Sequence, residues 1–338
     1  MDVKIIDVAR AAGVSTATVS RVLNGSPGVT PKTRSRVEAA VQELGYHPNA
    51  VAKNLRVQKT KTIAVIVQDI NVSYFTEIVK GIENMAYVKH YKVLICDSEN
   101  QAVKELEYLN LLMNRTVDAA ILVSPLVGDG QLTEIAERGY SIAVIGRHIG
   151  HEQIPCIYTD NVKFSLEVVR HLAEMGHRDI AFLSGFSDSI DSYERLEGYM
   201  KALKEQRLPF RPELIDSGGF SESGGYEAMG RLLDRAGGAL TAVYAANDEM
   251  ALGVYKCCRE RGLRIPEDIA VVGVDNNRIS KYISPSLSTV NQPKYTMGAL
   301  LVEKLIDSMN EDQFGDKRVF KVDSELLVRG SSSFRREG

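Results

Sequence analysis

Residues 5–24 read IIDVARAAGVSTATVSRVLN, and this stretch decides the fold of the N-terminal part of the chain. Its apolar residues recur at helical spacing in two short runs, Val8, Ala9 and Ala12 and then Val19, Val22 and Leu23. Gly13 supplies the permissive backbone of a sharp turn, and Ser15 is a good N-cap for the second helix. Two short helices joined by a tight turn form a helix-turn-helix, which places the start of its second helix in the major groove of DNA.

The outward face of that second helix is the expected base-reading surface. Small side chains on this face let the helix approach the groove, and Arg21 is long enough to reach a base edge. The residues expected to contact DNA from this part of the chain are Ser15, Thr16, Ala17, Thr18, Ser20, Arg21 and Asn24. Taken alone, the spacing also fits a plain helical hairpin on a protein surface.

A third helix and the segment after it favour DNA binding. Thr30 and Pro31 supply an N-cap followed by proline at the first helical position, and Gly45 closes the helix. Together with the first two helices, these features resemble the lactose repressor/galactose repressor family, and the resemblance runs over nearly the whole sequence. The motifs that carry it are Asp7-Val8-Ala9, Val14-Ser15, Thr18-Val19-Ser20-Arg21-Val22, Leu44-Gly45-Tyr46, Pro48-Asn49, Val51-Ala52 and Leu55.

The resemblance makes residues 1–47 the helix-turn-helix domain and residues 48–60 a hinge helix and linker. The implied hinge contacts to DNA are Asn49, Ala52, Leu55 and Arg56. A helix of about eight residues is unstable alone in water, because nucleation is costly. We therefore expect the hinge to become helical only where two copies pack together over the operator, with Leu55 as a minor-groove wedge. The alternative is a flexible linker with a chance apolar patch.

Charge is distributed unevenly along the 338 residues. Residues 1–60 contain nine Lys and Arg against four Asp and Glu, a net charge of +5. Residues 61–338 contain 32 against 40, a net charge of −8. A basic headpiece can neutralise phosphates, while an acidic body keeps the remainder from binding DNA indiscriminately.

Composition argues against several other classes of protein. The four cysteines have neither zinc-site nor redox spacing, so we expect reduced, mostly buried thiols and no metal. The N-terminus lacks the features of a signal peptide, and no apolar run approaches the ~18 residues of a membrane span. We therefore expect a cytoplasmic protein without membrane contact. No glycine-rich phosphate loop follows a predicted strand, so no cofactor is expected.

From residue 61 onward, apolar strand-like runs alternate with helical patterns, which predicts α/β architecture with parallel sheets. The strand-like runs are residues 62–67, 93–96, 119–123, 142–145, 180–183, 242–245 and 269–274. They are too many for one doubly wound domain, so we expect the body to divide in two near Asp160-Asn161. The resemblance implies that residues 61–338 form an effector-binding and dimerisation domain. The resemblance implies a two-lobed body like that of periplasmic binding proteins, with lobe one at about 61–160 and 292–322 and lobe two at about 161–291 and 323–338.

The expected effector site lies where loops converge at the carboxyl ends of the strands. The resemblance assigns effector contacts to Tyr74, Phe75, Arg147, Arg195, Phe220, Asn247 and Asp275. Asp248 is expected to cap the helix that follows it, and Arg147 has no evident packing reason to stand beside Gly146. Phe75 also fits ordinary core. Ser189 and Asp191 stand where purine-responsive family members place polar contacts, but the residue types differ.

The predicted function is a homodimeric transcriptional repressor that binds a palindromic operator in double-stranded DNA and is switched by a sugar-like effector. No nucleophile with a base, metal cluster or cofactor loop is evident, so no enzyme is expected. The alternative is a regulator of the catabolite-control type, controlled by a phosphorylated carrier protein that docks on lobe one. The motifs similar to that type are Leu44-Gly45-Tyr46, Pro48-Asn49-Ala50-Val51-Ala52 and residues 247–253.

Overall fold

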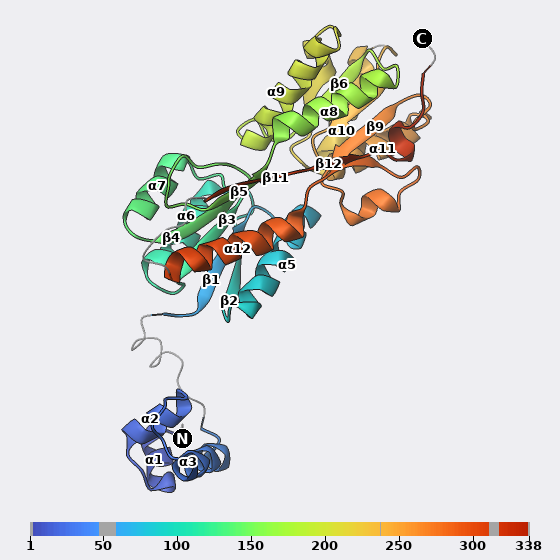
Figure 1. Ribbon diagram of the computed structural model, residues 1–338. Helices are drawn as coiled ribbons and strands as arrows, with labels where there is room; N and C mark the ends of the chain where they lie inside the picture. The colour runs from blue at the N-terminus through green and yellow to red at the C-terminus, as the bar shows by residue number, and fades with distance from the viewer. Residues whose placement is uncertain (1–2, 47–58, 237, 311–317, 337–338) are drawn as a thin grey trace. The chain divides into compact units, whose positions relative to one another are not determined.

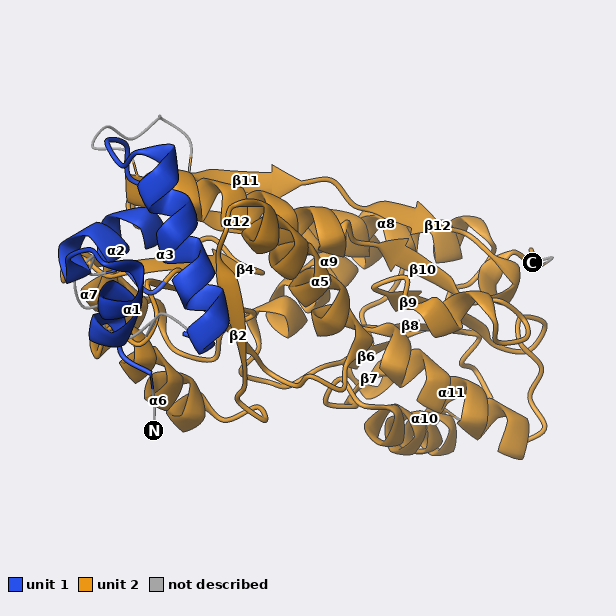
Figure 2. Cartoon of the chain, turned by 90° about the horizontal axis from the view of Figure 1, so that it is seen from below, with its two compact units in different colours: residues 1–60 blue, residues 61–338 orange. Residues whose placement is uncertain are grey.

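The computed structural model describes residues 3–46, 59–236, 238–310 and 318–336. The chain divides into two compact units, residues 1–60 and residues 61–338 (Figure 2). The predicted boundary at residue 47 and the predicted hinge contacts Asn49, Ala52, Leu55 and Arg56 lie outside the described residues.

Within its described residues, 3–46 and 59–60, the first unit has the helices α1 (Ile5–Ala12), α2 (Thr16–Leu23) and α3 (Pro31–Leu44). Gly13 ends α1 with a left-handed backbone at φ 61°, a conformation that glycine adopts without steric cost. Ser15 caps α2, because its side-chain oxygen accepts a hydrogen bond from the Thr18 amide at 3.2 Å. The predicted turn and cap are thus confirmed. The helices enclose a small core formed by Val8, Ala9, Ala12, Val19, Val22, Val37 and Ala40.

The second unit is built on two six-stranded sheets, each with its own helices (Figure 1). The first sheet is wholly parallel, in the order β11-β5-β4-β3-β1-β2. Its strands are β1 (Thr62–Val67), β2 (Lys92–Asp97), β3 (Ala119–Val123), β4 (Ser141–Ile145), β5 (Cys156–Thr159) and β11 (Val319–Val322). Helices α5 (Ser73–Val88) and α12 (Lys294–Asn310) cover one face, and α6 (Ala102–Met113) and α7 (Asp129–Glu137) cover the other. We call this assembly the first lobe.

The second lobe is formed by the sheet β12-β10-β9-β8-β6-β7, in which only β12 is antiparallel to its neighbour. Its strands are β6 (Ile180–Ser184), β7 (Ile215–Ser217), β8 (Ala242–Ala245), β9 (Ala270–Val274), β10 (Ser288–Asn291) and β12 (Glu325–Leu327). Its helices are α8 (Asn161–Glu174), α9 (Ile190–Glu205), α10 (Glu222–Ala236) and α11 (Asp248–Glu260), packed as the pairs α8–α9 and α10–α11. The inner strands of both sheets, such as β3, β8 and β9, are apolar and buried throughout, because helices cover both faces of each sheet.

The chain passes between the two sheets three times, after β5, after β10 and after β11. The second passage leads directly into α12, which packs closely against α5 of the same lobe. Gly81 and Gly298 make this approach possible, because a Cβ at either position would overlap a main-chain carbonyl of the opposite helix. The helices α5 and α12 therefore behave as one rigid pair.

Two further observations concern the described part of the chain. All four cysteines are free and buried, as predicted. No helix there is both long enough and apolar enough to span a membrane.

Candidate functional site

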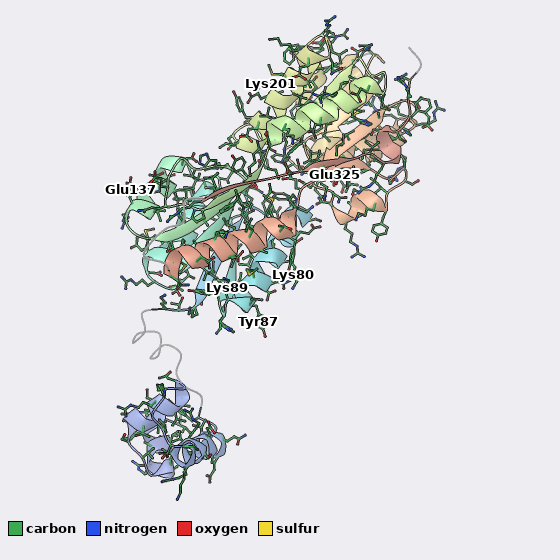
Figure 3. All side chains as sticks on the ribbon, viewed as in Figure 1. Lys80, Tyr87, Lys89, Glu137, Lys201 and Glu325 are labelled. Atoms are coloured by element: carbon green, nitrogen blue, oxygen red, sulfur yellow. The ribbon has the colours of Figure 1, made fainter. Side chains whose placement is uncertain are left out.

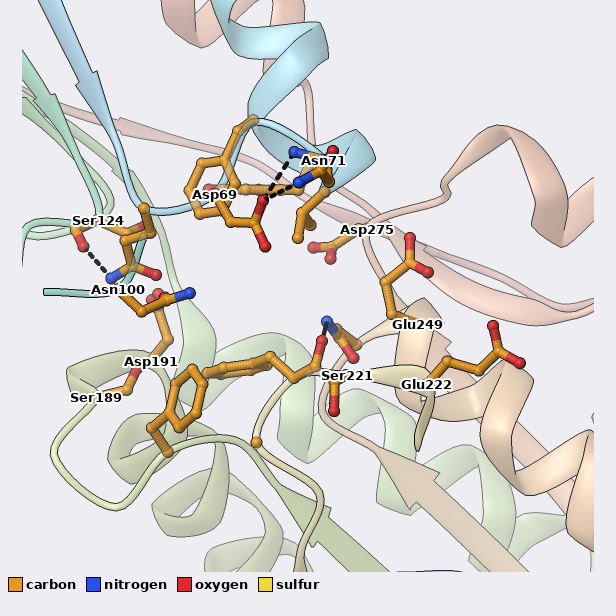
Figure 4. Close-up of a pocket in the computed structure, with 18 of the residues that line it drawn as sticks. Asp69, Asn71, Asn100, Ser124, Ser189, Asp191, Ser221, Glu222, Glu249 and Asp275 are labelled. Carbon is orange, nitrogen blue, oxygen red and sulfur yellow. Dashed lines mark hydrogen bonds between the residues drawn. The ribbon is translucent and has the colours of Figure 1, made fainter. Parts of the chain in front are cut away.

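A cavity of about 480 Å³ lies between the two lobes of the second unit (Figure 4). It is lined by segments that follow the carboxyl ends of β1, β6, β8 and β9, which is where ligands bind in open α/β sheets. Asp69 and Asn71 enter from the first lobe, and Ser189, Asp191 and Ser221 face them from the second. The two lobes therefore share one site.

Aromatic rings form the apolar part of the cavity. Tyr74 and Phe75 come from the first turn of α5, and Phe186 and Phe220 come from loops of the second lobe. The rings of Phe186 and Phe220 meet edge to face, with centroids 5.9 Å apart. Phe75 also packs in the core of the first lobe. It therefore lies both in the core and in the cavity lining, the two positions expected from the sequence. Such rings can pack on the apolar face of a sugar or a nucleobase.

Arg195 places a buried guanidinium at the back of the cavity. Its Nε donates to Asn161 Oδ1 at 2.9 Å, and Nη1 donates to the main-chain oxygen of Ala246. The guanidinium also lies 5.8 Å from the centre of the Phe220 ring, close enough for a cation–π interaction. These contacts fix the orientation of Arg195, because Asn161 at the start of α8 and Ala246 directly after β8 hold it from two sides.

Asp275 is the most deeply buried carboxylate of the lining. It follows β9 with a left-handed φ of 108°, and its Oδ1 accepts a hydrogen bond from Gln292 Nε2 at 2.8 Å. Burial raises the pKa of this carboxyl to about 6, although the charges of Arg195 and Lys294 act in the opposite direction. At neutral pH the site therefore holds an ionised carboxylate at a cost in free energy.

Asn247 lines the cavity and, in place of Asp248, also caps the helix that follows. Asn247 caps α11 by accepting from the Met250 amide at 2.9 Å, while its Nδ2 donates to the Phe220 carbonyl at 3.1 Å. The prediction that Asp248 caps this helix is wrong. Asp248 is fully buried and instead accepts from Thr289 Oγ1 at 2.6 Å and from the Asn277 amide at 2.7 Å.

Arg147 lines an adjoining cavity of about 330 Å³, which shares several lining residues with the first. Its Nε donates to Asp129 Oδ1 at 3.0 Å, and Nη2 donates to the Val127 carbonyl at 2.6 Å. The idea that this arginine lacks a structural reason is wrong, because it holds the loop between β3 and α7. Its expected contact with an effector would come from the adjoining cavity.

Several lining residues were absent from the predicted set. They are Gln68, Asp69, Asn71, Val72, Asn100, Ser124, Phe186, Ser189, Asp191, Gly219, Ser221, Glu222 and Glu249. Asp69 and Phe186 each lie two residues after the end of a strand, so the expectation of a site at the carboxyl ends of the strands could have included them. Nothing in the spacing alone distinguishes them from other loop residues.

The headpiece presents the residues predicted to read DNA along one side of α2. Thr16, Ala17, Arg21 and Asn24 are exposed. Ser15 and Thr18 are tied together by a hydroxyl–hydroxyl hydrogen bond of 2.9 Å, and Asn24 Nδ2 donates to Ser20 Oγ at 3.4 Å. Exposed small side chains beside one arginine suit close approach to a groove.

Comparison with known proteins places these features in a family. The model of the lacI family of bacterial regulatory proteins matches residues 4–49, and a periplasmic binding protein-like domain matches residues 169–332. Catabolite control protein A of Priestia megaterium is 37% identical over 333 residues, which covers 98% of this chain and 100% of the relative. This chain belongs to the lacI family. The lacI-family chain is a DNA-binding transcriptional regulator with a helix-turn-helix headpiece and a two-lobed α/β body.

Two solved structures resemble this lacI-family regulator over almost its full length. The lac repressor dimer bound to operator and the anti-inducer ONPF has a TM-score of 0.86 and 28% identity, and the match covers 98% of this chain and 99% of that one. The transcriptional regulator CelR in complex with cellobiose has a TM-score of 0.74 and 31% identity, covering 97% and 99%. Both the predicted family and the predicted fold class are confirmed.

Proposed function

We propose that this regulator is a dimeric repressor that binds a palindromic operator and is controlled by a sugar-like effector in the interlobe cavity. The observation that carries the proposal is a cavity, shared by two lobes, that combines aromatic faces with charged and polar groups. The complex of CelR with cellobiose supports a sugar as the ligand class. The regulator would act in the cytoplasm, where its DNA lies, and without catalysing a reaction.

The proposed effector contacts are divided between the two cavities. Tyr74, Phe75, Arg195, Phe220, Asn247 and Asp275 would contact the effector in the larger cavity, and Arg147 would do so from the adjoining one. The proposed DNA contacts are those of α2 together with Asn49, Ala52, Leu55 and Arg56. The proposed lobe boundaries are those predicted from the sequence, at about residues 160, 291 and 322.

The proposed dimer surface includes the outer side of α5 and the neighbouring edge strand β2. Tyr87 projects from α5, and 77% of the residue is exposed (Figure 3). Val88 lies beside it in sequence, and Leu94 and Ile95 are exposed on β2. Exposed apolar side chains on an unpaired sheet edge are suited to association with a second copy.

The charge of the cavity predicts which sugars bind. Five carboxylates line it, against the single guanidinium of Arg195. A phosphorylated sugar would face several like charges, so we expect each neutral sugar to bind at least about tenfold more tightly than its phosphate ester. Calorimetric titration of the full chain with cellobiose and cellobiose 6′-phosphate, and with ribose and ribose 5-phosphate, measures this difference.

The matched pairs act as their own controls, because the members differ only in the phosphate. Tighter binding of either phosphorylated sugar would contradict the charge argument. Failure of all four sugars to bind would argue against a sugar as effector.

The similarity to catabolite control protein A favours one second candidate. In that case a phosphorylated carrier protein, docked on the first lobe, would control DNA binding. Operator affinity measured with the sugar and with such a carrier, separately and together, distinguishes the two mechanisms.

A further inference from the structure

Asp275 is attached to the first lobe by a buried hydrogen-bonded chain. Gln292 donates to the Asp275 carboxylate, and Gln292 Oε1 accepts from Thr159 Oγ1 at 2.7 Å, at the end of β5. Asp275, Gln292 and Thr159 are all buried. The cavity wall of the second lobe is therefore bonded to the first sheet through the segment that crosses between β10 and α12.

Lys294 makes a second connection from the same crossing segment. It is the first residue of α12, and its Nζ donates to the main-chain oxygen of Asp275. The same Nζ lies 3.5 Å from Glu77 Oε2 in α5. One ammonium group thus touches the cavity wall of the second lobe and a helix of the first.

The position of Lys294 is unusual for a lysine, because only 2% of it is exposed. Burying an ammonium costs free energy unless it is paired and hydrogen-bonded. Its ion-pair partner Glu77 is half exposed, with 47% of its side chain accessible, so solvent weakens that attraction. The free energy of the buried ammonium therefore depends on the negative charge of Asp275, which lies on the side away from Glu77.

Helix α5 is well placed to respond to Lys294. Its first turn carries Tyr74 and Phe75 into the cavity, and Glu77 follows in the next positions. The middle of α5 packs closely on α12 at Gly81 and Gly298. A change in the attraction between Lys294 and Glu77 therefore acts on the start of α5 more readily than on its middle.

We propose that Lys294 is a positioning residue that transmits changes at Asp275 to the first turns of helix α5. A ligand that bonds to Asp275 changes the negative charge that faces the Lys294 ammonium. The attraction of the ammonium to Glu77 then changes relative to its attraction to Asp275. Such a ligand can bias the lobes only by this kind of differential interaction. The nature of the ligand rests on the proposed function, whereas the link from Asp275 through Lys294 to α5 does not.

The test is a double-mutant cycle read by amide hydrogen exchange in the full chain, without DNA or sugar. We expect Asp275→Ala to speed exchange at residues 76–80, in the first turns of α5, by about tenfold in the otherwise unchanged protein, and by less than about twofold in a Lys294→Met background. An equal effect in both backgrounds, or no effect of Asp275→Ala in the unchanged protein, would overturn the proposal.

The matched control is Lys304→Met, which makes the same change on the same helix. The Lys304 ammonium lies 5.9 Å from the centre of the Phe320 ring and contacts neither Asp275 nor Glu77 in the described structure. This background should retain the tenfold response, and its loss would overturn the assignment to Lys294.

If Lys294→Met does not fold, Glu77→Gln takes its place, because Glu77 is half exposed and tolerant of change. A smaller response to Asp275→Ala in this background supports the connection, and a full response overturns it. Since no sugar or DNA is present, a failure of the sugar titrations leaves this result readable.

Discussion

Asp275→Asn is expected to raise the free energy of unfolding of the body above that of the unchanged protein as the pH rises. Between pH 4 and pH 8 the difference between the two proteins should shift in favour of the variant by on the order of 3 kcal/mol. The pKa of this carboxyl is raised to about 6 from an ordinary value of 3.8, with burial as the main cause. A raised pKa means that the folded state holds the proton more tightly than the unfolded state. The stabilising contribution is therefore complete below pH 3.8 and is lost as the pH rises through 6. Asparagine has no proton to lose.

Urea unfolding of both proteins at pH 4, 5, 6, 7 and 8 measures this effect, since the other titrating groups are common to both. Asp323→Asn is the matched control, because the Asp323 side chain is almost fully exposed. Parallel stability curves for Asp275→Asn and the unchanged protein from pH 4 to pH 8 would contradict the expectation. A confirmed gain would mean that the cavity keeps a destabilising carboxylate, as functional sites often do.

Arg21→Ala is expected to weaken binding to the cognate operator by about 1–3 kcal/mol, or roughly 5–150-fold. Arg21 is the long charged donor on the exposed side of α2, and arginine can bond bidentately to guanine. We expect specificity to relax at one position in each half-site. An operator selected from random sequences with the full chain, followed by affinity measurements on single-base variants, tests both parts.

The control for this prediction is Arg10→Ala in α1, where the arginine is exposed and lies 3.8 Å from Asp7. This change should leave the preference at every operator position intact. If Arg21→Ala lowers affinity for random DNA as much as for the operator, then Arg21 contacts phosphate rather than a base.

Local chemistry explains why much of the fold could be predicted. The turn at Gly13 and the cap at Ser15 depend on neighbours within three residues, so the sequence contains the necessary information. The buried strands of the body are continuous apolar runs and were equally evident. Short strands such as β7 and β12 were missed, because three residues carry too little periodicity to be recognised.

The candidate site was predicted less completely, because its contacts join residues distant in the chain. Asp248 looked like a cap, yet its hydrogen-bond partners, Thr289 and Asn277, lie about 30 to 40 residues away. Arg147 was predicted to serve the effector alone, because its bonds to Asp129 and Val127 cannot be read from neighbouring residues in the sequence. Lys294 could not be distinguished in the sequence from any other lysine at the start of a helix. Its burial depends on residues from both lobes, which only the folded structure brings together.

The three passages of the chain between the sheets also determine the order in which a growing chain can complete its parts. Synthesis delivers the whole of β6 to β10 before α12 and β11 exist. Until then, the face of the first sheet that α12 later covers lacks the side chains of Met297, Leu301, Val302, Leu305 and Ile306. On the ribosome, the lobe whose synthesis begins first is therefore completed last. Between the synthesis of β5 and that of α12 it exposes an apolar face, and exposed apolar surface favours aggregation.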